Sequence, residues 1–337
     1  VWPSKPRMRL TFLQERLATG SLPPLVAFLI ASALWWLPSA DTAAATTGGL
    51  WDSVPGLLTP FGGRLAGYIL LLLALLLLGA VTVHHAVIRV HSTFYLTLFL
   101  LLAAVAQPHT LQGGSVSACC LAATFYFLFR TYQGVEPVGD VFRGFFFYGL
   151  ATLAVPPLLL LLPVLLLMQT GFHHLSPRTL CAALIGALLP YWFLGGYAYT
   201  IGEWDLLLRQ LAAVVRFSPT DYSTLTPPAI ATLALTLLLT LWSIIHYARN
   251  SFLDKIRTRT CIYYILSTEA LLWVLLAFQP VLYPSLAAPL TACASLLSGH
   301  YFAVTRDRRS GIGLLVTLAL IAALYLLDVW TQLYSSF

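Results

Sequence analysis

Charged side chains are scarce in this sequence. Asp, Glu, Lys and Arg together make up 9% of the 337 residues, whereas soluble domains carry about 25%. So little charge excludes an ordinary soluble globular protein. The chain is rich in apolar residues instead: hydrophobic residues make up 59% of it, and its mean hydropathy is +0.84. The sequence therefore predicts an integral membrane protein.

The short motifs of soluble cofactor chemistry are also absent. The chain has no Walker loop, no dinucleotide-binding glycine pattern, no Gly-x-Ser-x-Gly and no His-Glu-x-x-His. Its five cysteines lack the spacing of a metal site, so we expect them to pack as small hydrophobes. Adjacent histidines, as in His84–His85 and His173–His174, project about 100° apart on a helix and fit one metal ion poorly. We expect no cofactor and no metal.

A continuous basic stripe is missing as well, although the formal net charge is +6. The Lys and Arg residues lie in short segments between apolar runs. This distribution argues against a nucleic-acid partner and indicates membrane topology instead.

Apolar runs recur from Leu22 nearly to the C-terminus and leave no room for a soluble domain. We predict one all-α integral membrane domain over residues 1–337, a polytopic helix bundle of about eleven segments, with its N-terminus inside. The first run could mimic a signal peptide, but we interpret it as a retained span with its basic flank in the cytoplasm. The predicted spans are about 22–37, 65–83, 92–106, 115–129, 179–199, 228–247, 261–279, 286–304 and 311–330.

Residues 139–168, GDVFRGFFFYGLATLAVPPLLLLLPVLLLM, allow two topologies. If 144–168 crosses once, the basic loops ARNSFLDKIRTR and RDRR fall outside, against the positive-inside rule. If the stretch is two short helices meeting at Pro156–Pro157, both loops become cytoplasmic. Pro157 has no amide hydrogen and disfavours helical geometry at Pro156. We predict this hairpin, with arms of about 12 residues that rise about 18 Å, less than the hydrocarbon core of about 30 Å.

Two predicted external segments are longer than a simple connection requires. The first covers residues 38–64. The second, 202–228, places Leu206, Leu207, Leu211, Val214 and Val215 on one helical face and Glu203, Arg209, Gln210 and Arg216 toward another. This pattern predicts a helix lying in the membrane interface.

These external segments carry candidate site residues. An enzyme that uses a polyprenyl-phosphate donor needs a carboxylate as general base and cations for the departing phosphate. Asp41 and Asp52 are the candidate bases. The alternative is that solvated loops simply carry charges. The candidate phosphate or lipid head-group ligands are Arg64, His109, Arg209 and Arg216.

Glu269 lies far from either end of the apolar run CIYYILSTEALLWVLLAF. A carboxylate at that depth costs on the order of 3 kcal/mol unless it is paired or protonated, so it should face the bundle interior. His300 on the next span, or Ser267 and Thr268 nearby, could satisfy it. Glu269 and His300 are therefore a candidate intramembrane polar site for a proton or substrate, with a structural hydrogen bond as the alternative.

The run FRGFFFYGLATLAVPPLLLLLPVLLLM resembles a proline-broken segment of multi-pass GT-C-type glycosyltransferases, which use polyprenyl-phosphate sugars. LAATFYFLFRTYQG and LSGHYFAVTRDRR are similar to helix ends of such proteins. The order of spans, with ALIGALLPYWFLGGYAY, also resembles a family of uncharacterised bacterial inner-membrane proteins. The resemblance implies a GT-C-like fold and a base just after the first helix, where Asp41 lies; Asp52 is the substitute.

Two functions remain open. The first is transfer of a sugar from a polyprenyl-phosphate carrier at the outer face of the bacterial inner (cytoplasmic) membrane. The second is non-enzymatic: a membrane subunit of an envelope assembly or secretion machine, or a lipid-linked precursor carrier. Both predict membrane lipids and other membrane protein subunits as partners. A groove beside Asp41 or Asp52 would favour the first function, and an apolar flank for partner helices would favour the second.

Overall fold

The computed structural model describes residues 20, 22–37, 49–90, 92–132, 134, 137–172, 176–217, 220–305 and 307–335. Within these residues every regular element is a helix and no strand occurs, so the all-α prediction is confirmed. The α-helices, in chain order, are α2 (Leu22–Trp35), α3 (Pro60–His85), α4 (Phe94–Ala106), α5 (Gly113–Arg130), α6 (Pro137–Ala154), α7 (Leu162–Met168), α8 (Pro177–Ile201), α9 (Asp205–Val215), α10 (Pro227–Asn250), α11 (Ile256–Phe278), α12 (Tyr283–Val304) and α13 (Arg308–Ser335).

Among the described residues, seven helices are long and apolar enough to cross a membrane, which supports a membrane protein. They are α3, α5, α8, α10, α11, α12 and α13, with α10 taken as Pro227–Leu253, α12 as Pro280–Val304 and α13 as Arg309–Leu327. Helices α2 and α4 are apolar but shorter. The total of about eleven segments stays a prediction.

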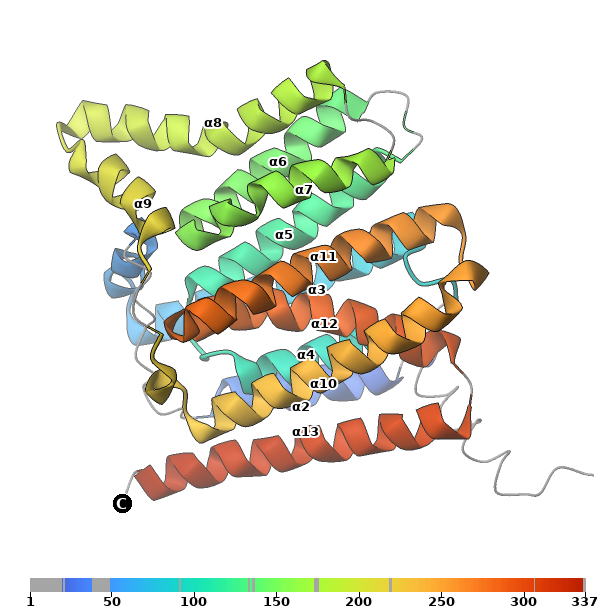
Figure 1. The fold of residues 1–337 in the computed structure, drawn as a ribbon. Helices are drawn as coiled ribbons and strands as arrows, with labels where there is room; N and C mark the ends of the chain where they lie inside the picture. The colour runs from blue at the N-terminus through green and yellow to red at the C-terminus, as the bar shows by residue number, and fades with distance from the viewer. Residues whose placement is uncertain are drawn as a thin grey trace, which may run out of the picture.

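Successive long helices run back and forth across the bundle (Figure 1), which sorts the connecting segments to two ends. We call the end that holds residues 86–90, 92–93 and 251–255 the basic end. The far end holds residues 49–59, 107–112, 202–217, 220–226 and 279–282. The basic end carries Arg89, Arg130, Arg178, Arg249, Lys255, Arg257 and Arg259, whereas the described basic residues of the far end are Arg64, Arg209 and Arg216.

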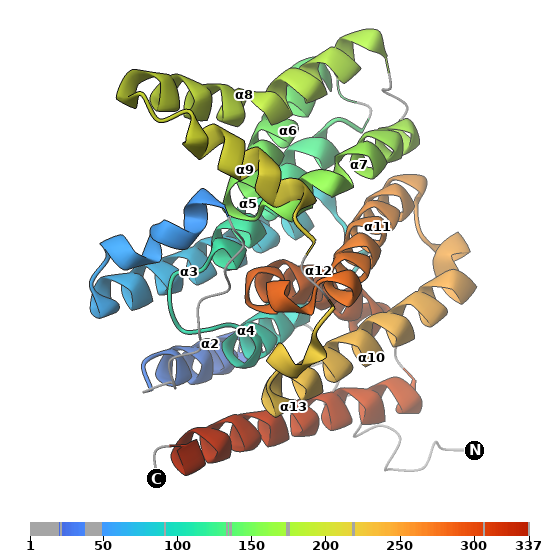
Figure 2. The ribbon, with the colours of Figure 1, turned by 60° about the vertical axis from the view of Figure 1, so that its left-hand side comes forward.

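Helix α12 is the centre of the bundle, with α4, α5, α10 and α11 packed around it (Figure 2). Every residue from Ser285 to Ala303 is buried, and most of them are small. Small side chains let helix backbones approach closely. A Cβ added at Gly299, for example, would lie 2.4 Å from the Cβ of Tyr95 on α4. The small residues of α12 therefore determine how tightly its neighbours pack.

The double proline turns the chain back. Helix α6 ends at Ala154, Val155 leaves the helical region, and the 3-10 helix η3 (Pro156–Leu161) leads into α7, which returns toward the basic end (Figure 1). Across the turn, the Tyr148 hydroxyl donates a hydrogen bond to the Leu158 carbonyl. The predicted turn of the chain at the double proline is confirmed.

The length predicted for the first hairpin arm was wrong. Helix α6 begins at Pro137 and has 18 residues, which rise about 27 Å. The polar start of the helix is accommodated because Asp140 pairs with Arg130 at 3.3 Å and with Arg143 at 3.3 Å. Residues that looked like a cytoplasmic loop therefore extend the helix at the basic end.

Helix α8 lies on the outer side of α6, and the two backbones almost touch (Figure 1). A Cβ added at Gly149 would lie 2.5 Å from the Ala187 carbonyl oxygen, and one added at Gly186 would lie 2.6 Å from the Phe142 carbonyl oxygen. Glycine on both helices thus permits the contact.

The substitution Gly149→Ala should force α6 and α8 apart and lower the free energy of unfolding by about 1–3 kcal/mol. The control is Gly79→Ala, because a Cβ at Gly79 meets nothing within 4 Å. Alanine also raises helix propensity there. Thermal unfolding of both purified variants in detergent checks the prediction, and equal melting temperatures would contradict it.

The orientation in the membrane stays a prediction, in which the positive-inside rule places the basic end in the cytoplasm. Two exposed side chains test it: Phe252 in η6 (Ser251–Leu253) at the basic end and Leu57 in η2 (Pro55–Leu57) at the far end. With the exposed Cys181 replaced by Ser, an impermeant thiol reagent should label Leu57→Cys but not Phe252→Cys in intact spheroplasts. Labelling in the reverse pattern would overturn the orientation.

Candidate functional site

The described candidate residues of the far end are Asp52, Arg64, His109, Arg209 and Arg216. Asp41 lies outside the described residues. Asp52 is half-buried in the 3-10 helix η1 (Leu50–Ser53). Arg209 and Arg216 are exposed, on α9 and just after it. The structure therefore places Asp52 and the basic residues of α9 at the same end of the bundle.

Gln210 joins these segments. Its Nε2 donates to the Leu153 carbonyl oxygen at 3.0 Å and to the Thr152 carbonyl oxygen at 3.4 Å, at the end of α6. Its Oε1 accepts from the backbone N–H of Leu50 at 2.9 Å. One amide side chain thereby connects α9, the end of α6 and η1.

The reason for this connection lies in the double proline. In a continuing helix, the carbonyls of Thr152 and Leu153 would accept from the N–H groups four residues later. Those positions are Pro156 and Pro157, which have no N–H. The amide of Gln210 supplies the missing donors, as buried carbonyls require.

The sequence interpretation of α9 was wrong at this residue. It grouped Gln210 with Arg209 and Arg216 on a polar face, but Gln210 is fully buried and both arginines are exposed. The helix itself is confirmed at Asp205–Val215. Hydrophobic patterning could not identify Gln210 as an interior residue, because its partners are backbone groups distant in the sequence.

Arg64 and His109 gather around Trp35. The indole Nε1 of Trp35 donates to the Arg64 carbonyl oxygen at 3.1 Å. The His109 ring is buried, its centroid lies 5.1 Å from that of Trp35, and its Nε2 lies 3.0 Å from the Ala104 carbonyl oxygen. His109 thus packs at the end of α4.

Glu269 is fully buried on α11, as its depth in the sequence predicts. Its predicted partners were wrong. The carboxyl contacts the Thr240 hydroxyl of α10 at 2.5 Å. The hydroxyls of Ser267 and Thr268 donate to backbone carbonyls of their own helix.

His300 belongs to a different polar cluster, at the basic end. Its Nε2 lies 3.3 Å from Asp254 Oδ2, and Arg89 Nη1 lies 3.8 Å from Asp254 Oδ1. Arg89 also donates to the Leu253 carbonyl oxygen at 3.0 Å. The three residues come from separate segments of the chain, so sequence reasoning missed Asp254 and Arg89 as partners of His300. One signal was present: Asp254 is a lone acid in a strongly basic loop.

The charges around Asp254 determine its protonation. Burial acts to raise the pKa of this carboxyl, but the hydrogen bond and charge of His300, with the charges of Arg89 and Arg259, outweigh burial and hold the pKa below its usual value. Asp254 therefore remains an anion at neutral pH, next to an imidazole.

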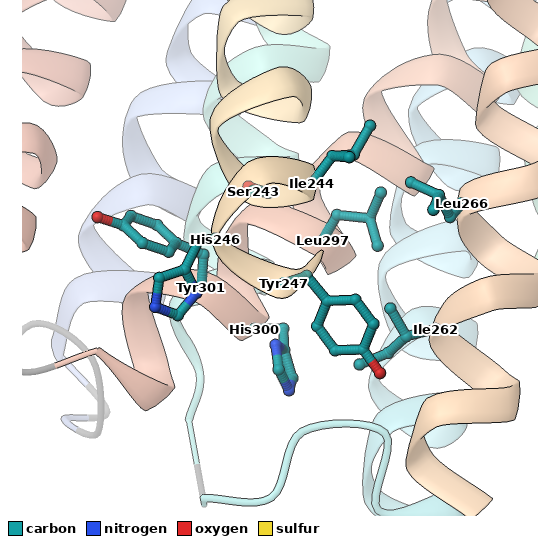
Figure 3. A pocket seen from close by; sticks show the side chains of 9 residues that line it. All are labelled: Ser243, Ile244, His246, Tyr247, Ile262, Leu266, Leu297, His300 and Tyr301. Carbon is teal, nitrogen blue, oxygen red and sulfur yellow. The ribbon is translucent and has the colours of Figure 1, made fainter. Parts of the chain in front are cut away.

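A small cavity of about 10 Å³ lies beside this cluster, with room for about one water molecule. We call it the basic-end cavity. Tyr247 and His300 lie side by side at its wall (Figure 3), with ring centroids 5.6 Å apart. Its lining residues are Ser243, Ile244, His246, Tyr247, Ile262, Leu266, Leu297, His300 and Tyr301.

Two other histidines at the basic end also contact residues from distant segments of the chain. His246 Nε2 lies 2.9 Å from the Thr305 hydroxyl, and His85 Nδ1 lies 3.1 Å from Arg257 Nη2. Within the described residues, no group of three or more His, Cys, Asp or Glu side chains is arranged to hold a metal ion.

Comparison of the chain with protein-family models, curated proteins and solved structures finds no match. The arguments for function therefore come from the residues and their geometry.

The substitution Asp254→Asn should lower the free energy of unfolding by about 2 kcal/mol at neutral pH, because it removes a charge-assisted contact. The folded-state pKa of Asp254 is lowered, so its contribution is full above the unfolded value of about 3.9 and is lost as pH falls through the folded value. The difference in melting temperature between wild type and variant should therefore shrink in acid. Asp205→Asn, an exposed acid, is the control, and a difference independent of pH would contradict the prediction.

Proposed function

We propose that this protein is a GT-C-like membrane protein that binds a polyprenyl-phosphate lipid at the far end and transfers its sugar. The observation that carries the proposal is the set of hydrogen bonds made by Gln210. They fix η1, which contains Asp52, against α9, which contains Arg209. A candidate base and a candidate phosphate ligand from distant parts of the chain thus belong to one corner of the bundle.

The chemistry of that corner fits the substrate. A polyprenyl-phosphate lipid presents a negative head group at the membrane surface and keeps its chain in the apolar core. Helix α9 offers Arg209 beside the exposed apolar side chains of Leu208 and Leu211. An amphipathic helix with a cation on its surface suits an anionic lipid. In the reaction, the carboxylate of Asp52 takes the proton of an acceptor hydroxyl while Arg209 stabilises the departing phosphate.

A second function is favoured by a separate observation on α8. This helix packs on α6 and α9 at the edge of the bundle (Figure 2). Several of its large aromatic side chains are exposed. They include Trp192, Phe193 and Tyr199. Such a surface accepts lipid or the helices of a partner subunit. The protein would then be a non-enzymatic membrane subunit, or a carrier of a lipid-linked precursor.

The test is an assay of the purified protein with a polyprenyl-phosphate sugar in lipid vesicles, with lipid binding and sugar transfer measured separately. Asp52→Asn should keep lipid binding and lower transfer by about 10²- to 10⁴-fold, because a general base is lost. Arg209→Gln and Gln210→Leu should both weaken binding, the first by removing the cation and the second by releasing η1 from α9. Asp41→Asn is assayed in parallel, alone and with Asp52→Asn.

Glu203→Gln, an exposed acid just before α9, is the matched control and should leave both measurements unchanged. Full transfer by the Asp41→Asn, Asp52→Asn double variant would reject the base assignment. Binding without transfer by the wild type would favour the precursor carrier. If the wild type shows neither lipid binding nor sugar transfer, the result would favour the function as a subunit of a larger membrane assembly.

A further inference from the structure

A stripe of hydroxyl groups runs along α10 on the side that faces the bundle interior. Its residues recur at helical spacings of three and four, so they share one face. All are buried: Thr232, Thr236, Thr240, Ser243 and Tyr247. The threonine and serine hydroxyls lie within hydrogen-bond distance of carbonyls one turn earlier in α10.

Midway along this stripe, Thr240 contacts Glu269. The Thr240 hydroxyl lies 2.9 Å from the Thr236 carbonyl oxygen and 2.5 Å from Glu269 Oε1. A hydroxyl has a single proton, so it cannot donate to both oxygens. A protonated Glu269 removes the conflict, because its own O–H then donates to Thr240.

The second oxygen of the carboxyl supports the neutral form. Glu269 Oε2 and the indole Nε1 of Trp273 are buried near each other, and neither makes a hydrogen bond of ordinary geometry with the described residues. A carboxylate anion in apolar surroundings needs several donors. These contacts therefore match a carboxyl that carries a proton.

The basic-end cavity begins about one helical turn from this carboxyl and reaches the cluster at the basic end. Ser243 follows Thr240 by about one helical turn on α10, and Leu266 precedes Glu269 by about one turn on α11; both line the cavity. At the other side of the cavity lies His300, which contacts Asp254. Figure 3 shows these lining side chains converging from α10, α11 and α12.

We propose that Glu269 is a membrane-interior proton-binding site that exchanges its proton with the basic end through the cavity, His300 and Asp254. The O–H bond of the Glu269 carboxyl breaks, and the proton passes over the Ser243 hydroxyl and one water molecule to the His300 imidazole. His300 releases a proton toward Asp254 and solvent. A solvent proton returns to Glu269 by the same path, so the carboxyl is protonated again at the end of the exchange and no charge is left behind. No electron transfer is involved.

Charged and titratable groups face this path from every neighbouring element. Around Glu269 the titratable group is Cys293 of α12, and the neutral Thr240 hydroxyl of α10 contacts the carboxyl. Around Asp254 they are Arg89 from the segment before α4, Arg259 of α11, His246 and Tyr247 of α10, and His300 of α12. Asp307, before α13, interacts electrostatically with His246. The positive charge of Arg89 and Arg259 compensates Asp254, so the pair can receive and release a proton without leaving an isolated buried charge.

This site lies away from Asp52 and Gln210 and does not depend on the sugar-transfer proposal. A proton site of this kind suits a membrane protein that couples a conformational change or a transport step to protons.

The test is infrared spectroscopy of the purified full-length protein in detergent, because the C=O stretch of a protonated, buried carboxyl is separate from that of carboxylates. Wild type should show one such band that is absent in Glu269→Gln and shifted in Glu269→Asp. After transfer into deuterated buffer, the rate of its deuterium shift reports proton exchange. That rate should fall about 10-fold or more in His300→Gln and in Asp254→Asn, since a proton-transfer group contributes about 10²-fold or more, while the band itself remains.

His84→Gln is the matched control, because His84 is an exposed histidine at the same end and lies outside the path. It should leave the exchange rate unchanged. A wild-type spectrum without the band, or exchange rates equal in wild type and His300→Gln, would overturn the proposal. Since the His300 and Asp254 variants keep Glu269, the rate comparison holds even where Glu269→Gln fails to fold.

Discussion

A backbone carbonyl in an apolar bundle must find a donor, and the far end of this protein depends on that requirement. Pro156 and Pro157 remove two donors at the point where α6 ends. Gln210 replaces them from α9, although it lies far along the sequence from the second proline. The same side chain then holds Leu50. The turn of the hairpin, the position of α9 and the placement of η1 are therefore consequences of one hydrogen-bonding need.

The need to satisfy backbone groups also distinguishes the two candidate sites, the one at the far end and the one in the interior. At the far end, polar groups satisfy backbone and leave Asp52 and Arg209 near the surface. In the interior, the hydroxyls of α10 satisfy their own helix, and Glu269 is the acid that this stripe meets. One end suits an anionic lipid head group, and the interior suits a proton. The two proposals thus use different physical environments of one bundle.

Much of the fold could be predicted from the sequence because it follows local patterns. Apolar length identified the helices, and the proline pair identified the turn at Val155. Side-chain partners did not follow from these patterns. Glu269 was expected to meet His300, Ser267 or Thr268, but its partner Thr240 lies on the preceding helix. Asp254 and Arg89 meet only through the folded chain. Composition and hydropathy carry no information on which polar residues of different helices face each other.

The Gln210 amide also has a mechanical consequence. Its donor and acceptor atoms belong to one planar amide on α9. The backbone of η1 and the carbonyls at the end of α6 are therefore held on opposite sides of the same group. A displacement of α9 along the membrane surface would carry both attachments with it. We therefore expect a ligand that displaces α9 to displace η1, with Asp52, and the hairpin turn as well.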